Sequence, residues 1–346
     1  MRLIKFIYKL MLFIALFISV VFVSDQLGFS LLSVDKIKGY EYFTTIHPKY
    51  EINDAARIEE GILLISKNNI GIFANNNIDW YKLNLERFRL FTNTKIAVIQ
   101  DLDKNVLHVI KGNKLFDLTY TLKISKLSVN KYGFILILTD NKDNYILTYD
   151  NNLKLTLHLS VREDIVDADF NNKKIVAILR TKDQDQKSYI SFIDRRGIYK
   201  SKELDEKFIR SYLIEDHLLC MDRKGQIMEI DQFIKPQKTY IKVKQQLEYL
   251  DGSYLLFNSL GQALIFNQIT DSFTTKQIEH FDKLILNQEN IILINSSNAY
   301  LFSKMLNKIK KIDDNLYNVK KIIIINDKIY YIYNNRIEVM KERIGL

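Results

Sequence analysis

The stretch GFILILTDNKDNYILTYDNNLKLTLHLS at residues 133–160 contains the pattern that decides the fold. An apolar run is followed by a short polar turn, a second apolar run that ends near Asp or Asn, and a looser third run. The same order returns in KKIVAILRTKDQDQKSYISFIDRRGIYKSKEL at 173–204 and in GSYLLFNSLGQALIFNQITDSFTTKQI at 252–278. From Gly61 to the C-terminus the motif recurs about every forty residues, a period typical of four-stranded repeats. Because one such sheet cannot bury both of its faces, the units must pack against one another.

Eight units align on their second strand, which in each unit is nearly continuous in apolar residues, as expected for a strand covered on both faces. These strands lie at 62–66, 96–100, 134–139, 175–180, 217–222, 254–259, 291–296 and 328–334. The strand before each of them is expected to be the innermost, with candidates at 123–129, 164–170, 208–214, 247–250, 283–287 and 319–325. The predicted fold is an all-β β-propeller of eight four-stranded blades, with seven blades as the alternative. A stack of two sheets is the main competitor, but a sandwich rarely needs more than about nine strands.

The two ends of the repeat region complement each other. The last unit ends after its third strand, RIEVM at 336–340, whereas the β-branched and aromatic stretch YEYFTTI at 40–46 has no unit of its own. An unpaired edge at each end of a ring invites aggregation. We therefore predict that residues 40–46 pair beside RIEVM and complete the last blade, so that 40–346 is one propeller domain.

Residues 1–24 are predicted to be a membrane anchor, followed by a spacer at 25–39. Basic residues at positions 2, 5 and 9 precede an uncharged run, LMLFIALFISVVFV, at 10–23. With the apolar residues before it, the segment reaches roughly the 20 residues that a bilayer requires, because lysine side chains can extend to the headgroups. The residues expected in the bilayer include Leu10, Phe13, Leu16, Val20 and Val23.

A cleaved signal peptide is the alternative interpretation of this segment. A cut after Ser24 would place Phe22 at the −3 position, where a small residue is required. An uncleaved single-pass anchor is therefore favoured. The positive flank predicts a cytoplasmic N-terminus and an extracytoplasmic propeller in either case.

The charge of the chain limits the classes of partner. The formal net charge is +9, and the positive residues are spread along the chain. One interpretation is attraction to an anionic surface such as a wall polymer, and the alternative is the coding bias of an AT-rich genome, in which lysine is abundant throughout. No nucleic-acid binding is predicted, because it requires a basic stripe. Cys220 is the only cysteine and lies in an apolar run, so we expect a small buried side chain and no intramolecular disulfide.

Few residues have the spacing that catalysis or metal binding requires. The five histidines are far apart, and no metalloprotease, phosphate-loop or serine-hydrolase motif occurs. The best polar cluster is Asp164, Asp167 and Asp169 on a predicted inner strand. Period-two geometry places Asp167 and Asp169 on one face, with Val166, Ala168 and Phe170 on the other. Two such carboxylates facing a channel could bind a cation or form an acid/base pair, and the competing interpretation is hydrogen bonding to backbone at a blade corner.

The stretch DIVDADFNNKKIVAIL at 164–179, followed by SYISFID at 188–194, resembles quinoprotein-like propellers. More closely, the chain looks like a family of low-GC Gram-positive proteins with one N-terminal span and an outside propeller. The resemblance implies seven or eight blades and no particular reaction. Quinone-dependent members carry a tryptophan in most blades and many charged ligands in the channel. Since Trp80 is the only tryptophan here, we expect no cofactor.

Two functions follow from these observations. The first is a scaffold at the outer membrane surface that binds an envelope protein or an anionic wall polymer and has no catalytic activity. The second is an extracellular glycan hydrolase or lyase that uses Asp167 or Asp169.

Overall fold

The computed structural model describes residues 39–59, 61–93, 95–140, 142–181, 187–194, 196–204, 208–230, 236–242, 248–250, 253–257, 262–267, 271–278, 281, 283–286, 290–295, 298–303, 308–313, 318–325 and 328–343. The predicted anchor at 1–24, with Leu10, Phe13, Leu16, Val20 and Val23, lies outside the described residues, as does the predicted spacer up to residue 38. Among the residues described, no helical segment has the length and apolar character that a membrane crossing requires.

The described residues form eight four-stranded antiparallel sheets, which confirms the prediction of an all-β fold built from such sheets. The first strands of the sheets are β2 (Asp54–Ile58), β6 (Phe88–Thr92), β10 (Lys123–Asn130), β14 (Asp164–Phe170), β18 (Phe208–Ile214), β22 (Glu248–Leu250), β26 (Lys283–Leu286) and β30 (Lys321–Ile325). The second strands are β3 (Gly61–Ile65), β7 (Ile96–Asp101), β11 (Gly133–Thr139), β15 (Ile175–Arg180), β19 (His217–Asp222), β23 (Ser253–Phe257), β27 (Asn290–Asn295) and β31 (Lys328–Ile332).

The remaining strands complete each sheet toward its outer edge. The third strands are β4 (Asn69–Ala74), β8 (Val106–Lys111), β12 (Asn144–Asp150), β16 (Ser188–Asp194), β20 (Gln226–Ile230), β24 (Gln262–Asn267), β28 (Asn298–Ser303) and β32 (Ile337–Arg343). The fourth strands are β5 (Asn77–Lys82), β9 (Lys114–Thr119), β13 (Leu155–Val161), β17 (Gly197–Leu204), β21 (Pro236–Lys242), β25 (Ser272–Gln277), β29 (Lys308–Asp313) and, in the last sheet, β1 (Gly39–Ile46).

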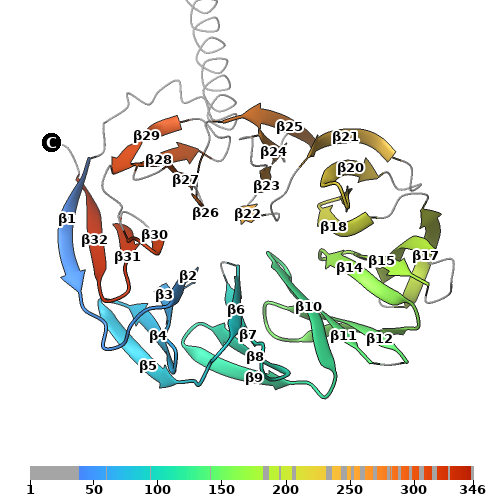
Figure 1. Ribbon diagram of the computed structural model, residues 1–346, viewed down its shortest axis with the longest axis horizontal. Helices are drawn as coiled ribbons and strands as arrows, with labels where there is room; N and C mark the ends of the chain where they lie inside the picture. The colour runs from blue at the N-terminus through green and yellow to red at the C-terminus, as the bar shows by residue number, and fades with distance from the viewer. Residues whose placement is uncertain are drawn as a thin grey trace, which may run out of the picture.

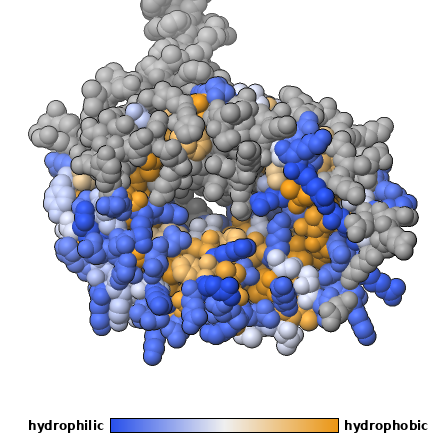
Figure 2. Space-filling model, viewed as in Figure 1, coloured by the Kyte–Doolittle hydropathy of each residue, from blue (hydrophilic) through white to orange (hydrophobic). Residues whose placement is uncertain are grey.

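The sheets follow one another around a central axis, with the first strands nearest the centre (Figure 1). Among the coloured residues of Figure 2, hydrophilic ones lie mainly at the outer rim and apolar ones gather nearer the middle. This is the arrangement of a β-propeller, in which each sheet buries both faces against its neighbours.

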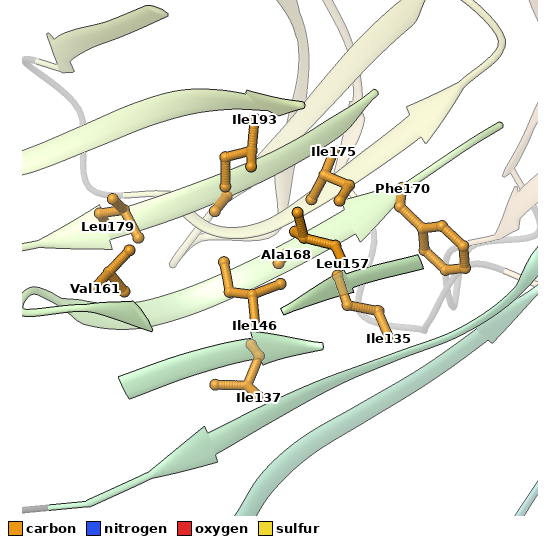
Figure 3. Close-up of a cluster of buried hydrophobic side chains, with 11 residues drawn as sticks. Ile135, Ile137, Ile146, Leu157, Val161, Ala168, Phe170, Ile175, Leu179 and Ile193 are labelled. Carbon is orange, nitrogen blue, oxygen red and sulfur yellow. The ribbon is translucent and has the colours of Figure 1, made fainter. Parts of the chain in front are cut away.

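The second strands show why nearly continuous apolar sequence is required. In β15, Ile175, Ala177 and Leu179 pack in a cluster with the preceding sheet (Figure 3). The intervening residues Val176 and Ile178 pack in a different cluster with the following sheet. Because alternate side chains of one strand enter two separate cores, a polar residue at any of these positions would lie in an apolar interface.

The first and last of the described strands, β1 and β32, pair with each other as predicted. β1 runs antiparallel to β32, with a register from Gly39↔Arg343 to Ile46↔Ile337. The junction with the first sheet is also hydrogen-bonded, since the amide of Ile52 donates to the Asn334 carbonyl at 2.7 Å. We call the β1–β32 pairing and this junction the seam.

The strand directions define two faces of the ring. On the face that we call face 1, the first strand of each sheet ends and the second begins, and the third ends and the fourth begins. Face 2 holds the opposite strand ends. Because β1 occupies the position of a fourth strand, it begins on face 1 at Gly39 and ends on face 2.

Candidate functional site

The predicted acid pair lies on β14, and a β-bulge decides which way its side chains point. The register of β14 with β15 shifts between Ile165 and Asp167. Ala168 and Phe170 pack toward the preceding sheet, as predicted. The prediction for Val166 was wrong, since it packs toward the following sheet, on the same side as the acid pair. The extra residue of a bulge reverses the alternation, and this cannot be read from period-two spacing.

Asp167 is 3% exposed and links three neighbouring sheets. Its Oδ1 accepts a hydrogen bond from the Lys126 ammonium on β10, with which it also forms an ion pair. Its Oδ2 accepts a hydrogen bond from the backbone amide of Ser211 on β18, at 2.7 Å. Both carboxylate oxygens are therefore used in contacts between sheets.

Asp169 repeats this contact two residues further along the strand. Its Oδ2 accepts a hydrogen bond from the amide of Leu213 at 2.8 Å. Its Oδ1 accepts from the amide of Phe170 at 2.8 Å and from Nδ2 of Asn130 at 3.3 Å. The two acids lie two residues apart on β14, and the amides of Ser211 and Leu213 lie two residues apart on β18. The carboxylates therefore act as acceptors for the backbone amides of an edge strand that has no strand beside it.

Burial raises the pKa of both carboxyl groups, because it disfavours their charged forms. For Asp167, the Lys126 ammonium and the Ser211 amide oppose that rise in pKa. For Asp169, burial together with the charge of Asp167 raises the pKa to about 7, against the hydrogen bonds from Leu213, Phe170 and Asn130.

Asp164 does not join this pair. It lies at the other end of β14, is exposed, and accepts a hydrogen bond from Nδ2 of Asn144 at 3.4 Å. Among the residues that the structure describes, no group of three His, Cys, Asp or Glu side chains converges as metal ligands.

A set of asparagines on face 1 also connects consecutive sheets, and sequence reasoning missed it. Nδ2 of Asn93 donates to the Asn130 carbonyl at 2.6 Å. Nδ2 of Asn130 donates to the Phe170 carbonyl at 2.7 Å, and Nδ2 of Asn171 donates to the Glu215 carbonyl at 2.6 Å. We call Asn93, Asn130 and Asn171 the asparagine clamps, because each binds the backbone of the next sheet.

Each asparagine clamp also closes its own turn. Oδ1 of Asn93 accepts from the amides of Lys95 and Ile96, and Oδ1 of Asn171 accepts from Lys173 and Lys174. This is an Asx turn, in which the side chain replaces a backbone acceptor. The signal in the sequence is an Asn three or four residues before a second strand.

Charged groups extend the face 1 contacts toward the β18–β19 turn. Lys131 forms an ion pair with Glu215, and the Tyr132 hydroxyl lies 3.4 Å from the same carboxylate. Lys174 and Lys173 pair with Asp216, at 3.2 and 3.6 Å. Three consecutive sheets, beginning with β10, β14 and β18, therefore meet in one polar network on this face.

His217 and His108 have acidic partners, and Cys220 lies in an apolar core. His217 joins two sheets, with Nδ1 2.6 Å from Glu229 and Nε2 3.3 Å from Asp271. His108 lies 2.7 Å from Asp117 on the adjacent strand, as expected for a satisfied sheet histidine, whereas His158 is exposed. Cys220 is fully buried as predicted, and burial raises the pKa of its thiol.

Comparison with known proteins supports the fold. No protein-family model and no curated protein matches the sequence. BamB from Moraxella catarrhalis is similar in structure at 10% identity and a TM-score of 0.51, covering 87% of this chain and 99% of that chain. The computationally designed Ika8 protein is similar at 11% identity and a TM-score of 0.55, covering 88% and 100%. The chain therefore has a β-propeller fold that resembles BamB, and identities this low concern the fold alone.

Proposed function

We propose that this protein is a binding scaffold whose rigid ring presents its surface to a partner in the cell envelope. The observation that carries the proposal is the use of Asp167 and Asp169. Their oxygens accept hydrogen bonds from β18, β10 and β14 itself. A general acid or base must reach the proton it transfers, and these carboxylates instead hold neighbouring sheets together. The asparagine clamps also hold neighbouring sheets together.

In this proposal each sheet is one blade of an eight-bladed propeller. The ring belongs with the quinoprotein-like propellers, in the single-span family of low-GC Gram-positive bacteria that the sequence resembles. It binds no quinone cofactor. The eight sheets among the described residues and their order around the ring support this blade count.

The proposal includes the single-pass anchor at 1–24, with the propeller on the extracytoplasmic side. In this proposal the orientation of the ring follows from β1, which begins on face 1. Face 1 then points toward the membrane, and face 2 is turned to the partner. Changing Leu16 and Val20 to Arg is expected to release the protein from the membrane fraction, because a charge at the centre of a span costs about 2.5–3.5 kcal/mol. Retention of this variant in the membrane fraction would contradict the anchor.

The partner is an envelope protein or an anionic wall polymer. The net charge of +9 favours the anionic polymer, because opposite charges attract. Crosslinking of the full-length protein in native membranes, followed by affinity purification, tests the first kind of partner. Retention on purified wall polymer at low salt, lost at high salt, tests the second. If neither experiment yields reproducible binding, the scaffold proposal fails.

A glycan hydrolase or lyase remains the second candidate, and the observation that favours it is the pKa of Asp169, which burial raises to about 7. A general acid at neutral pH requires a pKa of this kind. The test is glycan cleavage by the wild type and by the Asp167→Asn, Asp169→Asn double variant, with unfolding monitored in parallel. Cleavage that disappears in a folded double variant would support the enzyme and overturn the scaffold.

A further inference from the structure

A cavity of about 240 Å³ lies on face 1 between the β10–β13 sheet and the β14–β17 sheet. Its apolar wall contains Leu157, Phe170, Ile175 and Ile193. These residues belong to the apolar cluster of Figure 3, where Phe170 lies far from Val161 and Leu179. The cavity therefore lies at the face 1 end of the apolar interface between the two sheets.

Two carboxylates line this cavity from equivalent positions in the two sheets. Asp150 is the last residue of β12, and Asp194 is the last residue of β16. Asp150 uses Oδ1 to accept from the amides of Asn152 and Lys154, and Asp194 uses Oδ1 to accept from the amide of Arg196. Within the described part of the chain, the Oδ2 atoms of both residues have no hydrogen-bond partner. These two oxygens can accept hydrogen bonds from a cationic ligand group.

Two lysines supply positive charge to the same cavity. Lys173 and Lys174 line it, and both pair with Asp216, whose side chain is 66% exposed. Ion pairs to an exposed carboxylate contribute little free energy. A ligand carboxylate can therefore replace Asp216 as the partner of Lys174 at small cost.

The volume limits the size of the ligand. An engineered cavity of about 150 Å³ holds one benzene molecule, whereas drug-sized ligands occupy about 300–1,000 Å³. The volume here, about 240 Å³, suits one ring or branched alkyl group together with a few more heavy atoms. It is too small for a length of glycan.

We propose that this cavity binds a free amino acid with an aromatic or branched apolar side chain. The ammonium group contacts Asp150 and Asp194, the carboxylate contacts Lys174, and the side chain enters the apolar end beside Phe170. This inference is independent of the scaffold function, because the cavity lies on face 1, whereas the proposed partner binds face 2, and the predicted anchor takes no part in it.

The test is calorimetric titration of the full-length protein, in a mild detergent, with L-phenylalanine and L-leucine. We expect dissociation constants between ~1 μM and ~1 mM. N-acetyl-L-phenylalanine lacks the ammonium group and L-phenylalaninamide lacks the carboxylate. Each is expected to bind at least about tenfold more weakly, which corresponds to ~1.4 kcal/mol.

Matched variants locate the binding. Asp150→Asn retains the Oδ1 that closes the turn and removes the charge, so it should weaken L-phenylalanine binding about tenfold. Asp222→Asn is its control, because Asp222 also accepts from two amides of its own turn, Lys224 and Gln226, but lies outside the cavity. Lys174→Gln provides a second variant if Asp150→Asn fails to fold, with Lys187→Gln as its surface control.

Three results would overturn the proposal. The first is the absence of binding by both amino acids at millimolar concentration. The second is binding that survives both acetylation and amidation unchanged. The third is an equal loss in Asp150→Asn and Asp222→Asn, which would place the effect in turn stability and not in the cavity.

Discussion

The contact between β14 and β18 and the seam between β1 and β32 hold the ring by different means. At the seam, two backbones form a ladder of hydrogen bonds from Gly39 to Ile46. Between β14 and β18, the carboxylates of Asp167 and Asp169 take the place of a strand and accept the amide hydrogens of Ser211 and Leu213. A backbone ladder forms with almost any side chains, whereas a side-chain ladder requires particular ones.

Burial shows the same contrast. The outer side of β1 exposes Tyr42 by 61% and Phe43 by 48%, whereas Asp167 is 3% exposed. The seam should therefore tolerate substitution of its exposed side chains, and the β14–β18 contact should tolerate very little.

Deletion of Gly39–Ile46 should have the largest effect, because it removes the whole ladder and leaves β32 as an open edge. We expect the variant to unfold without a cooperative transition and to lose most of its free energy of unfolding, which is ~5–15 kcal/mol for a typical domain. Urea unfolding followed by circular dichroism measures it. The control is Tyr42→Ser with Phe43→Ser, which keeps the backbone and should change stability by about 0.5 kcal/mol or less per site. A deletion variant that unfolds like the wild type would show that the seam does not close the ring.

Asp167→Ala should destabilise the protein by about 3 kcal/mol, because it leaves the Ser211 amide buried without an acceptor and the Lys126 ammonium without its partner. The double variant Lys126→Met, Asp167→Leu should recover part of this loss. Asp164→Ala on the same strand is the control, with about 0.5 kcal/mol or less expected at an exposed site. Chemical unfolding midpoints measure all three variants, and equal losses for Asp167→Ala and Asp164→Ala would contradict the side-chain ladder.

Asn130→Ala should cost about 1–3 kcal/mol, because both the Phe170 carbonyl and the Tyr132 amide lose a partner. Asn130→Asp separates the two contacts, since it keeps the acceptor for Tyr132 and cannot donate to Phe170. Because it also places a carboxylate oxygen against the Phe170 carbonyl and the Asp169 carboxyl, its unfolding temperature should fall at least as far as that of Asn130→Ala. Asn77→Ala, at the exposed start of β5, is the control and should change little. If Asn130→Asp equals the wild type, the clamp between sheets contributes nothing.

The stability of the wild type relative to Asp169→Asn should depend on pH. Burial raises the pKa of Asp169 from about 3.9, its ordinary value in an unfolded chain, to about 7. Between these values the folded state binds a proton that the unfolded state has released, so stability from this group falls as pH rises. The difference in unfolding free energy, wild type minus variant, should therefore decline from about pH 4 to about pH 7 and remain constant above. A difference that rises over this interval would mean that the carboxylate is stabilised by its amide donors.

Arg87→Ala should have the smallest effect. Its guanidinium pairs with Asp103 at the surface, with Nε 2.8 Å from Oδ1. Exposed pairs of this kind are screened by water and salt. We expect no measurable change in the unfolding midpoint, at low or high salt. A clear fall in the unfolding midpoint would show that exposed ion pairs contribute to the stability of this ring.

Most of the fold could be predicted from the order of apolar runs and turns. The predicted inner strands at 164–170 and 208–214 coincide with β14 and β18, and the predicted partner of residues 40–46 coincides with β32. The inner strands follow from periodicity, which is local along the chain. The pairing of residues 40–46 follows from the need to cover the two unpaired edges of the repeat region. The acid pair on β14 was found for the same reason, since Asp167 and Asp169 share one face of a strand.

The repeated four-stranded unit, its apolar second strand and the strand that completes the last sheet are all encoded in the order of residues. The partners of Asp167, Asp169 and the asparagine clamps, and the bulge that turns Val166 to the other side, become visible only once the sheets have packed. The cause is the long separation along the chain between these groups and their partners. A β-strand pattern specifies which way a side chain points, but the amides of Ser211 and Leu213 reach β14 only after two sheets have packed together.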